Sequence, residues 1–467
     1  MKRIQFIFIS ITLACHVHAQ LPSNNFEGVL KHENQTLNFI FKCSFELDAY
    51  KTLLYIPEQF IYEKRANNTY FEDDSINIQF RDFQAHYAGR IIRDSMLISG
   101  KWVQRGTEFP LTLYFKSFNE ATSFERPQEP KPPFPYVVSE HTIPNRKEKI
   151  NLSGTLTLPD TTQIHTLVIL ISGSGPQDRN EELGGHKPFL VIADYLTRNG
   201  IAVFRFDDRG VGKSEGDYTT ATTMDFANDV MSIVKYFKKH PHINPKKIGL
   251  IGHSEGGIVS MMVASKMKKD VSFIVSLAGP GVTMVDLLLR QTEDIMRAAG
   301  AKEDFIEITR LINYQMYNLA MTEPNPDSLM NKMSGFLIEA TADLSETEIE
   351  KYGLNKETIR MSAMQLYTPW MKYFLTIRPS EYLQKIKCPV LALNGSLDIQ
   401  VAADDNLEAI DRYIREGKNY NVKTVKMNGL NHLFQKAEKG TIGEYMVISE
   451  TFNQLALQEI LQFLKAR

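Results

Sequence analysis

A serine flanked by glycines lies where a buried strand is predicted to run directly into a helix. The segment Gly252-His253-Ser254-Glu255-Gly256 has the spacing G-x-S-x-G, between an apolar strand at 248–251 and an apolar helix at 258–266. The spacing alone is weak evidence, since it arises by chance about once in ten chains of this length. Its strand–turn–helix setting predicts that Ser254 is a nucleophile on a strained turn. The alternative is a glycine-rich turn with a structural role only.

A serine hydroxyl is a poor nucleophile at neutral pH and requires a base within hydrogen-bond reach. Among the 11 histidines, our candidate is His432, because it follows a strand predicted at 422–427 and can reach the edge of the sheet where the serine lies. His240 and His242 precede the serine's strand, near its wrong end. His253 is held beside the serine and points elsewhere on the turn. A surface position for His432 is the alternative.

An acid must orient the imidazole and offset its positive charge in the transition state. Asp398 follows a buried strand at 390–393 and a glycine turn, so we predict that it is this acid. Asp404 and Asp405 compete for the role, but they begin the next helix, where carboxylates are expected as caps. The order serine, aspartate, histidine along the chain is that of the α/β hydrolases.

Two preorganised N–H donors must stabilise the oxyanion that forms during acyl transfer. The amide of Glu255, directly after the predicted nucleophile, is one candidate. The loop 172–178 (Ser-Gly-Ser-Gly-Pro-Gln-Asp) follows the first buried strand and offers the amide of Ser174 as the second. A phosphate loop is the alternative, but the loop lacks the Lys-Ser/Thr ending of a P-loop.

A second glycine-rich segment, residues 205–216, also resembles a nucleotide-binding loop. It contains no G-x-G-x-x-G, and we interpret it as a turn that supports the loop 172–178. Its charged residues Asp208 and Arg209 are therefore predicted to be structural rather than catalytic.

Short apolar runs alternate with helical patterns after residue 137, which predicts an α/β domain with a mostly parallel sheet covered on both faces. The strands are predicted at 167–171, 201–206, 248–251, 273–277 and 390–393, with helices at 189–198 and 226–240. Residues 281–379, between the last two of these strands, are rich in helical periodicity and methionine. We expect this insertion to form a helical cap over the carboxyl ends of the strands of the catalytic domain, residues 137–467.

Residues 20–125 follow a different pattern, in which apolar and polar residues alternate with a period of two. Leu37, Phe39 and Phe41 share one face of such a run, and repeated short alternating strands predict an all-β antiparallel sandwich or barrel. Residues 126–136 then contain five prolines in eleven positions. That composition predicts a stiff linker, with a proline-rich ligand for a partner domain as the alternative.

The first 19 residues have the layout of a signal peptide. Lys2 and Arg3 precede an apolar run at 4–14, and Val17 and Ala19 place small residues before a cut after residue 19. We therefore expect an exported protein, periplasmic or secreted. Cys15 follows a poor lipobox, so lipid anchoring is the lesser alternative, as is a buried N-terminal strand or helix.

The composition is that of a folded globular protein, with 43% hydrophobic and 23% charged residues among 467. The net charge of -2 gives no reason to expect nucleic acid or an anionic membrane surface. After residue 19 no apolar run approaches the roughly 18 residues of a spanning helix. Cys43 and Cys388 lie in different predicted domains, which argues against a disulfide framework and a zinc site.

The catalytic segments together resemble a group of bacterial α/β-hydrolase carboxylesterases that carry a β-rich N-terminal domain and a helical cap. The matching segments are 172–180, 206–214, 252–257, 369–370, 394–401 and 429–435, and the segments 100–106 and 110–113 extend the match into the N-terminal domain. The resemblance implies hydrolysis of short-chain acyl esters without a metal or organic cofactor. It also implies Ser254 as nucleophile, Asp398 as acid and His432 as base.

The substrate predicted on this basis is a small-molecule ester, held against apolar residues of the cap. Candidate contacts in the cap are Tyr314, Met316, Met364, Tyr367 and Trp370, although each is more often plain core. A peptidase, or another acyl hydrolase or acyltransferase on the same residues, is the alternative within enzymes. A carbohydrate-binding or cell-envelope adhesion protein is the alternative from another class. The sequence leaves a homo-oligomer open.

Overall fold

The computed structural model describes residues 24–467, apart from residues 33–34, 47–48, 57–58, 60, 73, 93–96, 117–125, 352–353 and 446. The chain divides into two compact units, residues 1–123 and 124–467. The predicted signal peptide, residues 1–19, and Cys15 within it lie outside the described residues.

The first unit is an antiparallel sheet, which confirms the predicted all-β N-terminal domain. Its strands among the described residues are β1 (Asn24–His32), β2 (Gln35–Glu46), β3 (Ala49–Ile56), β4 (Ile61–Arg65), β5 (Asn68–Glu72), β6 (Ser75–Phe80), β7 (Ala85–Ile92), β8 (Leu97–Gln104) and β9 (Thr107–Lys116). They pair in the order β4-β3-β2-β1-β9-β8-β7-β6-β5. The amide of Ala66 donates to the carbonyl oxygen of Thr52 on β3, and the amide of Asn67 donates to that of Gln79 on β6, each at a distance of 2.8 Å. The two ends of the sheet therefore approach each other.

The second unit is built on a mixed sheet with the order β10-β11-β13-β12-β14-β15-β16-β17. Its strands are β10 (Val137–Asn145), β11 (Ile150–Leu158), β12 (His165–Ile171), β13 (Ala202–Phe206), β14 (Ile243–His253), β15 (Phe273–Leu277), β16 (Val390–Gly395) and β17 (Val422–Met427). Strands β12 to β17 pair in parallel, whereas β10 and β11 are antiparallel. The predicted α/β-hydrolase architecture is confirmed.

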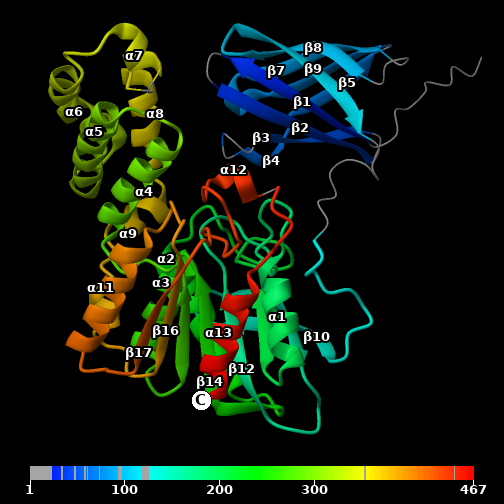
Figure 1. Ribbon diagram of the computed structural model, residues 1–467, viewed down its shortest axis with the longest axis vertical. Coiled ribbons are helices and arrows are strands. Elements are labelled where there is room, and N and C mark those ends of the chain that lie inside the picture. The colour runs from blue at the N-terminus through cyan, green and yellow to red at the C-terminus, as the bar shows by residue number, and fades with distance from the viewer. Residues whose placement is uncertain are drawn as a thin grey trace, which may run out of the picture. The chain divides into compact units, whose positions relative to one another are not determined.

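Helices cover both faces of this sheet (Figure 1). One face packs on α1 (Pro188–Arg198) and α13 (Gln454–Lys465), and the other on α2 (Thr223–Phe237), α3 (Glu255–Lys266) and α11 (Ala403–Glu416). Successive side chains of a strand point to opposite faces; on β12 those of Leu167 and Ile169 reach one core and those of Val168 and Leu170 the other. Because both faces are buried, the strand reads as a continuous apolar run.

A helical cap interrupts the chain between β15 and β16. It consists of α4 (Met284–Ala298), α5 (Glu303–Thr322), α6 (Pro326–Ala340), α7 (Glu346–Lys351), α8 (Lys356–Gln365) and α9 (Pro369–Leu375), and α10 (Ser380–Leu383) and α12 (Ile442–Tyr445) lie elsewhere in the unit. The cap has its own apolar core, which includes Ile312, Met316 and Met333. In Figure 1 helices α5 to α8 extend away from the sheet, while α4 and α9 lie next to it. No helix in the described part of the chain is long and apolar enough to span a membrane.

The proline-rich segment 126–136 lies within the second unit. Arg126 donates to the carbonyl oxygens of Gly184 (3.2 Å) and Ile448 (2.6 Å). The Gln128 side chain accepts the amide of Thr451 at 2.6 Å. These bonds hold at least the beginning of the predicted linker on the surface of the catalytic unit.

Candidate active site

Ser254 occupies a strained turn between β14 and α3, with φ 51° and ψ −119°. A positive φ is costly for a residue other than glycine and persists only where the surroundings enforce it. The flanking glycines allow this turn, because a Cβ on Gly252 would lie 2.0 Å from the carbonyl oxygen of Gly256 and a Cβ on Gly256 would lie 2.1 Å from that of Ile171. The predicted strand–turn–helix therefore has the backbone that presents a nucleophile.

His432 and Asp398 form a buried hydrogen-bonded pair. Nδ1 of His432 lies 2.7 Å from Oδ2 of Asp398, and the two residues are 4% and 6% exposed. The other carboxylate oxygen of Asp398 accepts the amides of Gln400 and Val401, each at 2.8 Å. When Nδ1–H donates to a carboxylate, the neutral ring has its lone pair on Nε2.

The competing carboxylates lie on the surface and bind other partners. Asp404 accepts from Lys426 at 2.8 Å, and Asp405 accepts from Arg290 at 3.0 Å. The structure thus brings Asp398, rather than its two neighbours, to the histidine.

The loop that carries His432 is held by a buried asparagine, Asn431, which was not among the predicted site residues. The Asn431 side chain accepts the amides of Leu433 (3.0 Å) and Gln435 (2.9 Å) and donates to the Gln435 side chain (2.9 Å). Asn431 and Gln435 are fully buried. An asparagine directly before a candidate catalytic histidine in a glycine-containing loop is the sequence signal that could have identified this turn.

A cavity of about 260 Å³ contains Ser254 and His432 on its wall. The cap supplies its apolar side, through Leu287, Leu288, Trp370 and Phe374, and also contributes the polar Gln291. A wider hollow of about 750 Å³, between residues 144–147 and α2, contains none of the predicted site residues. We therefore take the smaller cavity as the candidate active site.

The loop after β12 borders this cavity and is joined to the turn at Ser254. The amide of Gly173 donates to Oε1 of Glu181 at 2.7 Å, so it is already committed to a partner. The hydroxyl of Ser174 donates to Oε2 of Glu255 at 2.8 Å. Among the described residues, the amides of Ser174 and Glu255 have no hydrogen-bond acceptor, and both remain available as donors.

The Glu255 side chain connects the site to the cap. Its carboxylate accepts from the hydroxyl of Thr223 (2.6 Å) and from the indole N–H of Trp370 (2.9 Å), in addition to Ser174. Burial raises the pKa of Glu255, and these hydrogen bonds oppose the increase. The role predicted from the sequence concerned only the amide of Glu255, and Thr223 was not among the predicted site residues.

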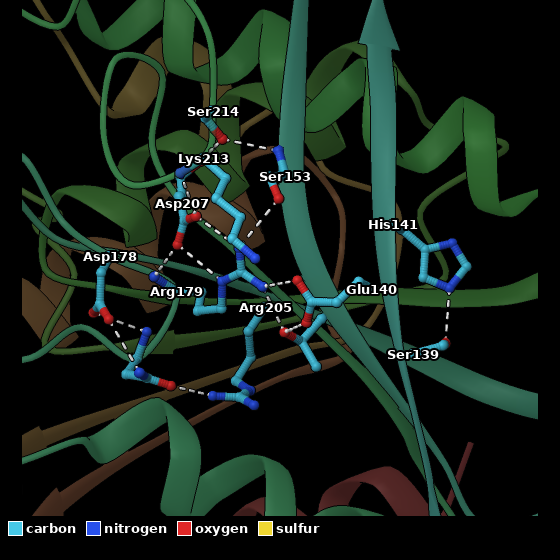
Figure 2. Close-up of polar contacts among 12 residues, drawn as sticks. Ser139, Glu140, His141, Ser153, Asp178, Arg179, Arg205, Asp207, Lys213 and Ser214 are labelled. Atoms are coloured by element: carbon cyan, nitrogen blue, oxygen red, sulfur yellow. Dashed lines mark hydrogen bonds and ion pairs between the residues drawn. The ribbon is translucent and has the colours of Figure 1, made fainter.

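An ion-pair network fixes the far end of the same loop (Figure 2). The guanidinium of Arg179 donates to both oxygens of Asp207 (2.9 and 2.7 Å) and to Glu140 (2.6 Å). Asp207 also accepts the amide of Lys213 at 3.1 Å. Burial alone would raise the pKa of Asp207, but the hydrogen bonds and the charge of Arg179 hold it below its ordinary value.

Asp208 and Arg209 lie in supporting positions, as their predicted structural role requires. Asp208 accepts from the Ser172 hydroxyl (2.9 Å) and the Gln177 amide (3.1 Å) at the two ends of the loop 172–178. Burial raises the pKa of Asp208 well above the ordinary value. Arg209 donates to the buried carboxylate of Asp229 at 2.7 and 2.8 Å.

Of the cap residues proposed as substrate contacts, Trp370 lines the cavity. Tyr314 and Met364 are 50% and 57% exposed, and the Tyr367 hydroxyl donates to the carbonyl oxygen of Glu323 within the cap; none of these three lines the cavity. Met316 is buried in the cap core. Helical periodicity shows that the cap has apolar faces, but it does not show which face meets the sheet.

The sheet order defines an α/β hydrolase, and the cavity contains the serine of the strained turn after β14. Residues 186–432, 247 of the 467 in the chain, match the family described as serine aminopeptidase, S33. The chain belongs to this family and is a serine hydrolase. Esterase EstD of Thermotoga maritima is 26% identical over 340 residues, which are 72% of this chain and 68% of EstD.

Two solved structures are similar at low sequence identity. The first is the esterase Pf2001 of Pyrococcus furiosus, with 18% identity and a TM-score of 0.42 over 71% of this chain and 91% of that one. The second is the α/β hydrolase GrgF of a Penicillium species, with 17% identity and a TM-score of 0.43 over 71% of this chain and 98% of that one.

Proposed function

We propose that the chain is a serine carboxylesterase whose catalytic residues are Ser254, His432 and Asp398. The observation that carries this proposal is the 2.7 Å hydrogen bond between His432 and Asp398, beside a cavity that also contains Ser254. The similarity to Esterase EstD supports an ester as the substrate.

In the proposed mechanism, Nε2 of His432 takes the proton of Ser254 as the hydroxyl oxygen attacks the ester carbonyl. Asp398 holds the ring through Nδ1–H and offsets its charge. The free amides of Ser174 and Glu255 donate to the oxyanion. The imidazolium then protonates the departing alcohol, and a water activated by the same histidine releases the acid from the acyl-enzyme.

The size and lining of the cavity support small acyl groups. A volume of about 260 Å³ lies below the range of about 300–1,000 Å³ that is common for drug-sized ligands. Leu287, Leu288 and Phe374 provide an apolar wall for a short hydrocarbon chain, while the polar groups gather around Ser254.

An aminopeptidase is the second candidate, because the family description names that activity and the same residues can cleave an amide. Turnover of p-nitrophenyl acetate should exceed turnover of alanine p-nitroanilide in kcat/KM. Faster cleavage of the anilide would replace the esterase assignment with a peptidase.

The catalytic assignment is tested with p-nitrophenyl esters of two to twelve carbons. Ser254→Ala should lower kcat by roughly 10⁴- to 10⁶-fold, and Asp398→Asn by roughly 10⁴-fold, because the amide no longer fixes the useful tautomer. Asp404→Asn is the matched control and should retain wild-type kcat. Activity that persists in Ser254→Ala would exclude this serine as the nucleophile.

We further propose that residues 1–19 direct export to the periplasm or the medium. The basic residues Lys2 and Arg3 followed by a short apolar run support this. N-terminal sequencing of the protein from its native cells should begin at Gln20.

A further inference from the structure

The imidazole of His253, the residue before the nucleophile, links three parts of the site. Its Nδ1 lies 2.9 Å from Oε1 of Glu181, and its Nε2 lies 3.0 Å from the main-chain oxygen of His432. The same Glu181 oxygen accepts the amide of Gly173 at 2.7 Å. His253 and Glu181 are 7% and 3% exposed, so water does not compete for these contacts.

The chemistry of these contacts determines where protons must lie. The carbonyl oxygen of His432 can only accept, so Nε2 of His253 must carry a hydrogen to bind it. The contact between Nδ1 and Glu181 needs a second proton, because a bare imidazole nitrogen and a carboxylate oxygen are both acceptors. The ring holds this proton, since imidazole is the stronger base by about two pKa units. A neutral ring without the carboxylate could instead place its one N–H on Nδ1, which would leave Nε2 facing a carbonyl oxygen without a proton.

We propose that Glu181 and His253 form a positioning pair, which keeps a hydrogen on Nε2 and so ties the main chain of His432 to the nucleophile turn and to the loop after β12. This inference rests on the proposed function, in which His432 is the base. Neither residue of the pair touches the reacting atoms in the proposed mechanism.

The surroundings of His253 favour the protonated ring. Glu181 faces it from the loop after β12, Asp398 from the loop after β16, and His432 from the loop after β17. Burial alone would lower the pKa of His253, but the two carboxylates and the two hydrogen bonds raise it above its ordinary value. The ring centroids of His253 and His432 lie 4.8 Å apart, with an angle of 47° between the ring planes. A shift in the position of one ring therefore changes its contact with the other.

A small displacement of His432 is sufficient to slow the reaction, because a base about 1 Å from its productive position can cost roughly 100-fold in rate. The pair acts on the oxyanion loop as well, since Glu181 holds the amide of Gly173, the residue before Ser174. One carboxylate thereby sets the position of both the base and an oxyanion donor.

The test is Glu181→Gln, which keeps the size of the side chain and an acceptor oxygen but removes the charge that stabilises the imidazolium. Wild-type kcat for p-nitrophenyl acetate should stay level from about pH 7 to 9. In Glu181→Gln it should be at least about 10-fold lower throughout this interval, with little change in KM. Burial lowers the pKa of His253 once the carboxylate charge is removed, so the ring of the variant is already neutral at pH 7. Equal kcat in the two proteins across the interval would overturn the proposal.

Glu444→Gln is the matched control. Glu444 also accepts a main-chain amide, that of Gly440 at 2.6 Å, but it lies outside the cavity lining. This variant should keep the wild-type pH profile whatever its change in thermal stability. A decline equal to that of Glu181→Gln would show that the effect is not specific to the pair and would also overturn the proposal.

A readout independent of turnover is the ¹⁵N NMR spectrum of the histidine side chains, with His253 assigned by its loss in His253→Asn. At pH 7.5 both ring nitrogens of His253 should be protonated in wild type and in Ser254→Ala, and only one in Glu181→Gln. An unprotonated Nε2 in wild type would refute the pair. Failure of the esterase assays alone would instead reject the proposed function and leave this spectrum unchanged.

Discussion

The indole nitrogen of Trp370 lies 2.9 Å from Oε1 of Glu255, the residue directly after Ser254. Trp370 belongs to the cap helix α9, and its ring stacks on Phe374 with centroids 4.8 Å apart. The cap is therefore bonded to the turn that carries Ser254. Because Glu255 is almost fully buried, moving the cap away would remove one donor from a carboxylate that has little access to water.

Trp370→Phe should weaken this connection while retaining an aromatic ring against Phe374. A hydrogen bond to a charged group contributes about 1.5–3 kcal/mol, so we expect kcat/KM for a short ester to fall about 10-fold or more. Tyr367→Phe is the control, since it removes one hydrogen bond within the cap, to the carbonyl of Glu323, and none to the site. Steady-state kinetics should separate the two variants; equal losses would mean that the bond to Glu255 has no special role.

Leu287→Ala should shift the preference towards longer acyl chains. Leu287 lines the cavity, and each additional methylene that the enlarged wall buries contributes about 0.8 kcal/mol, or about fourfold in kcat/KM. Leu289→Ala is an exact chemical match on the same helix, but Leu289 packs in the cap core. Both variants should lose stability, by about 2–5 kcal/mol, and only Leu287→Ala should change the chain-length optimum. The same shift in both would point to a loosened cap rather than a larger pocket.

Asp207→Asn should lower stability at neutral pH but not in acid. The folded-state pKa of Asp207 is depressed, so its stabilisation is present above the unfolded-state pKa of about 3.9 and is lost as the pH falls through the lower folded-state value. Loss of a buried charged partner costs on the order of 3 kcal/mol. Urea unfolding should show the variant less stable at pH 7, with the two curves converging only as the pH falls below the depressed folded-state pKa of Asp207. A difference that is independent of pH would assign the effect to packing.

The main features of the catalytic fold could be predicted from local sequence. Residues 273–277 and 422–427 form strands with the predicted bounds. The first is buried on both faces and reads as a short, mostly apolar run, whereas the second ends at the turn residues Asn428 and Gly429. The strands β10 and β11 were missed. Their alternation of Leu152, Leu156 and Leu158 with polar residues follows a proline-rich segment and resembles the pattern of the N-terminal unit.

The site was less predictable wherever contacts join distant parts of the chain. A spacing rule identifies Ser254, but nothing in the local sequence indicates that His253 contacts Glu181, which lies 72 residues earlier. Likewise, Leu287 and Leu288 reach the cavity because α4 follows β15 directly, whereas Tyr314 and Met364 share their apolar character and lie exposed on the cap. Composition describes which residues are apolar, and only the packing of the helices decides which of them a substrate meets.

Strands β15 and β16 pair in regular parallel register, from Ile274 with Val390 to Leu277 with Leu393, although the entire cap separates them in the chain. The entropic cost of closing such a loop grows only with the logarithm of its length, so the sheet tolerates insertions of very different size at this place. The proposed catalytic residues consequently lie outside the inserted stretch, while Leu287, Leu288, Trp370 and Phe374 of the cavity wall lie within it. A differently shaped cap joined at the same two strand ends would change this wall and leave the proposed catalytic residues in place.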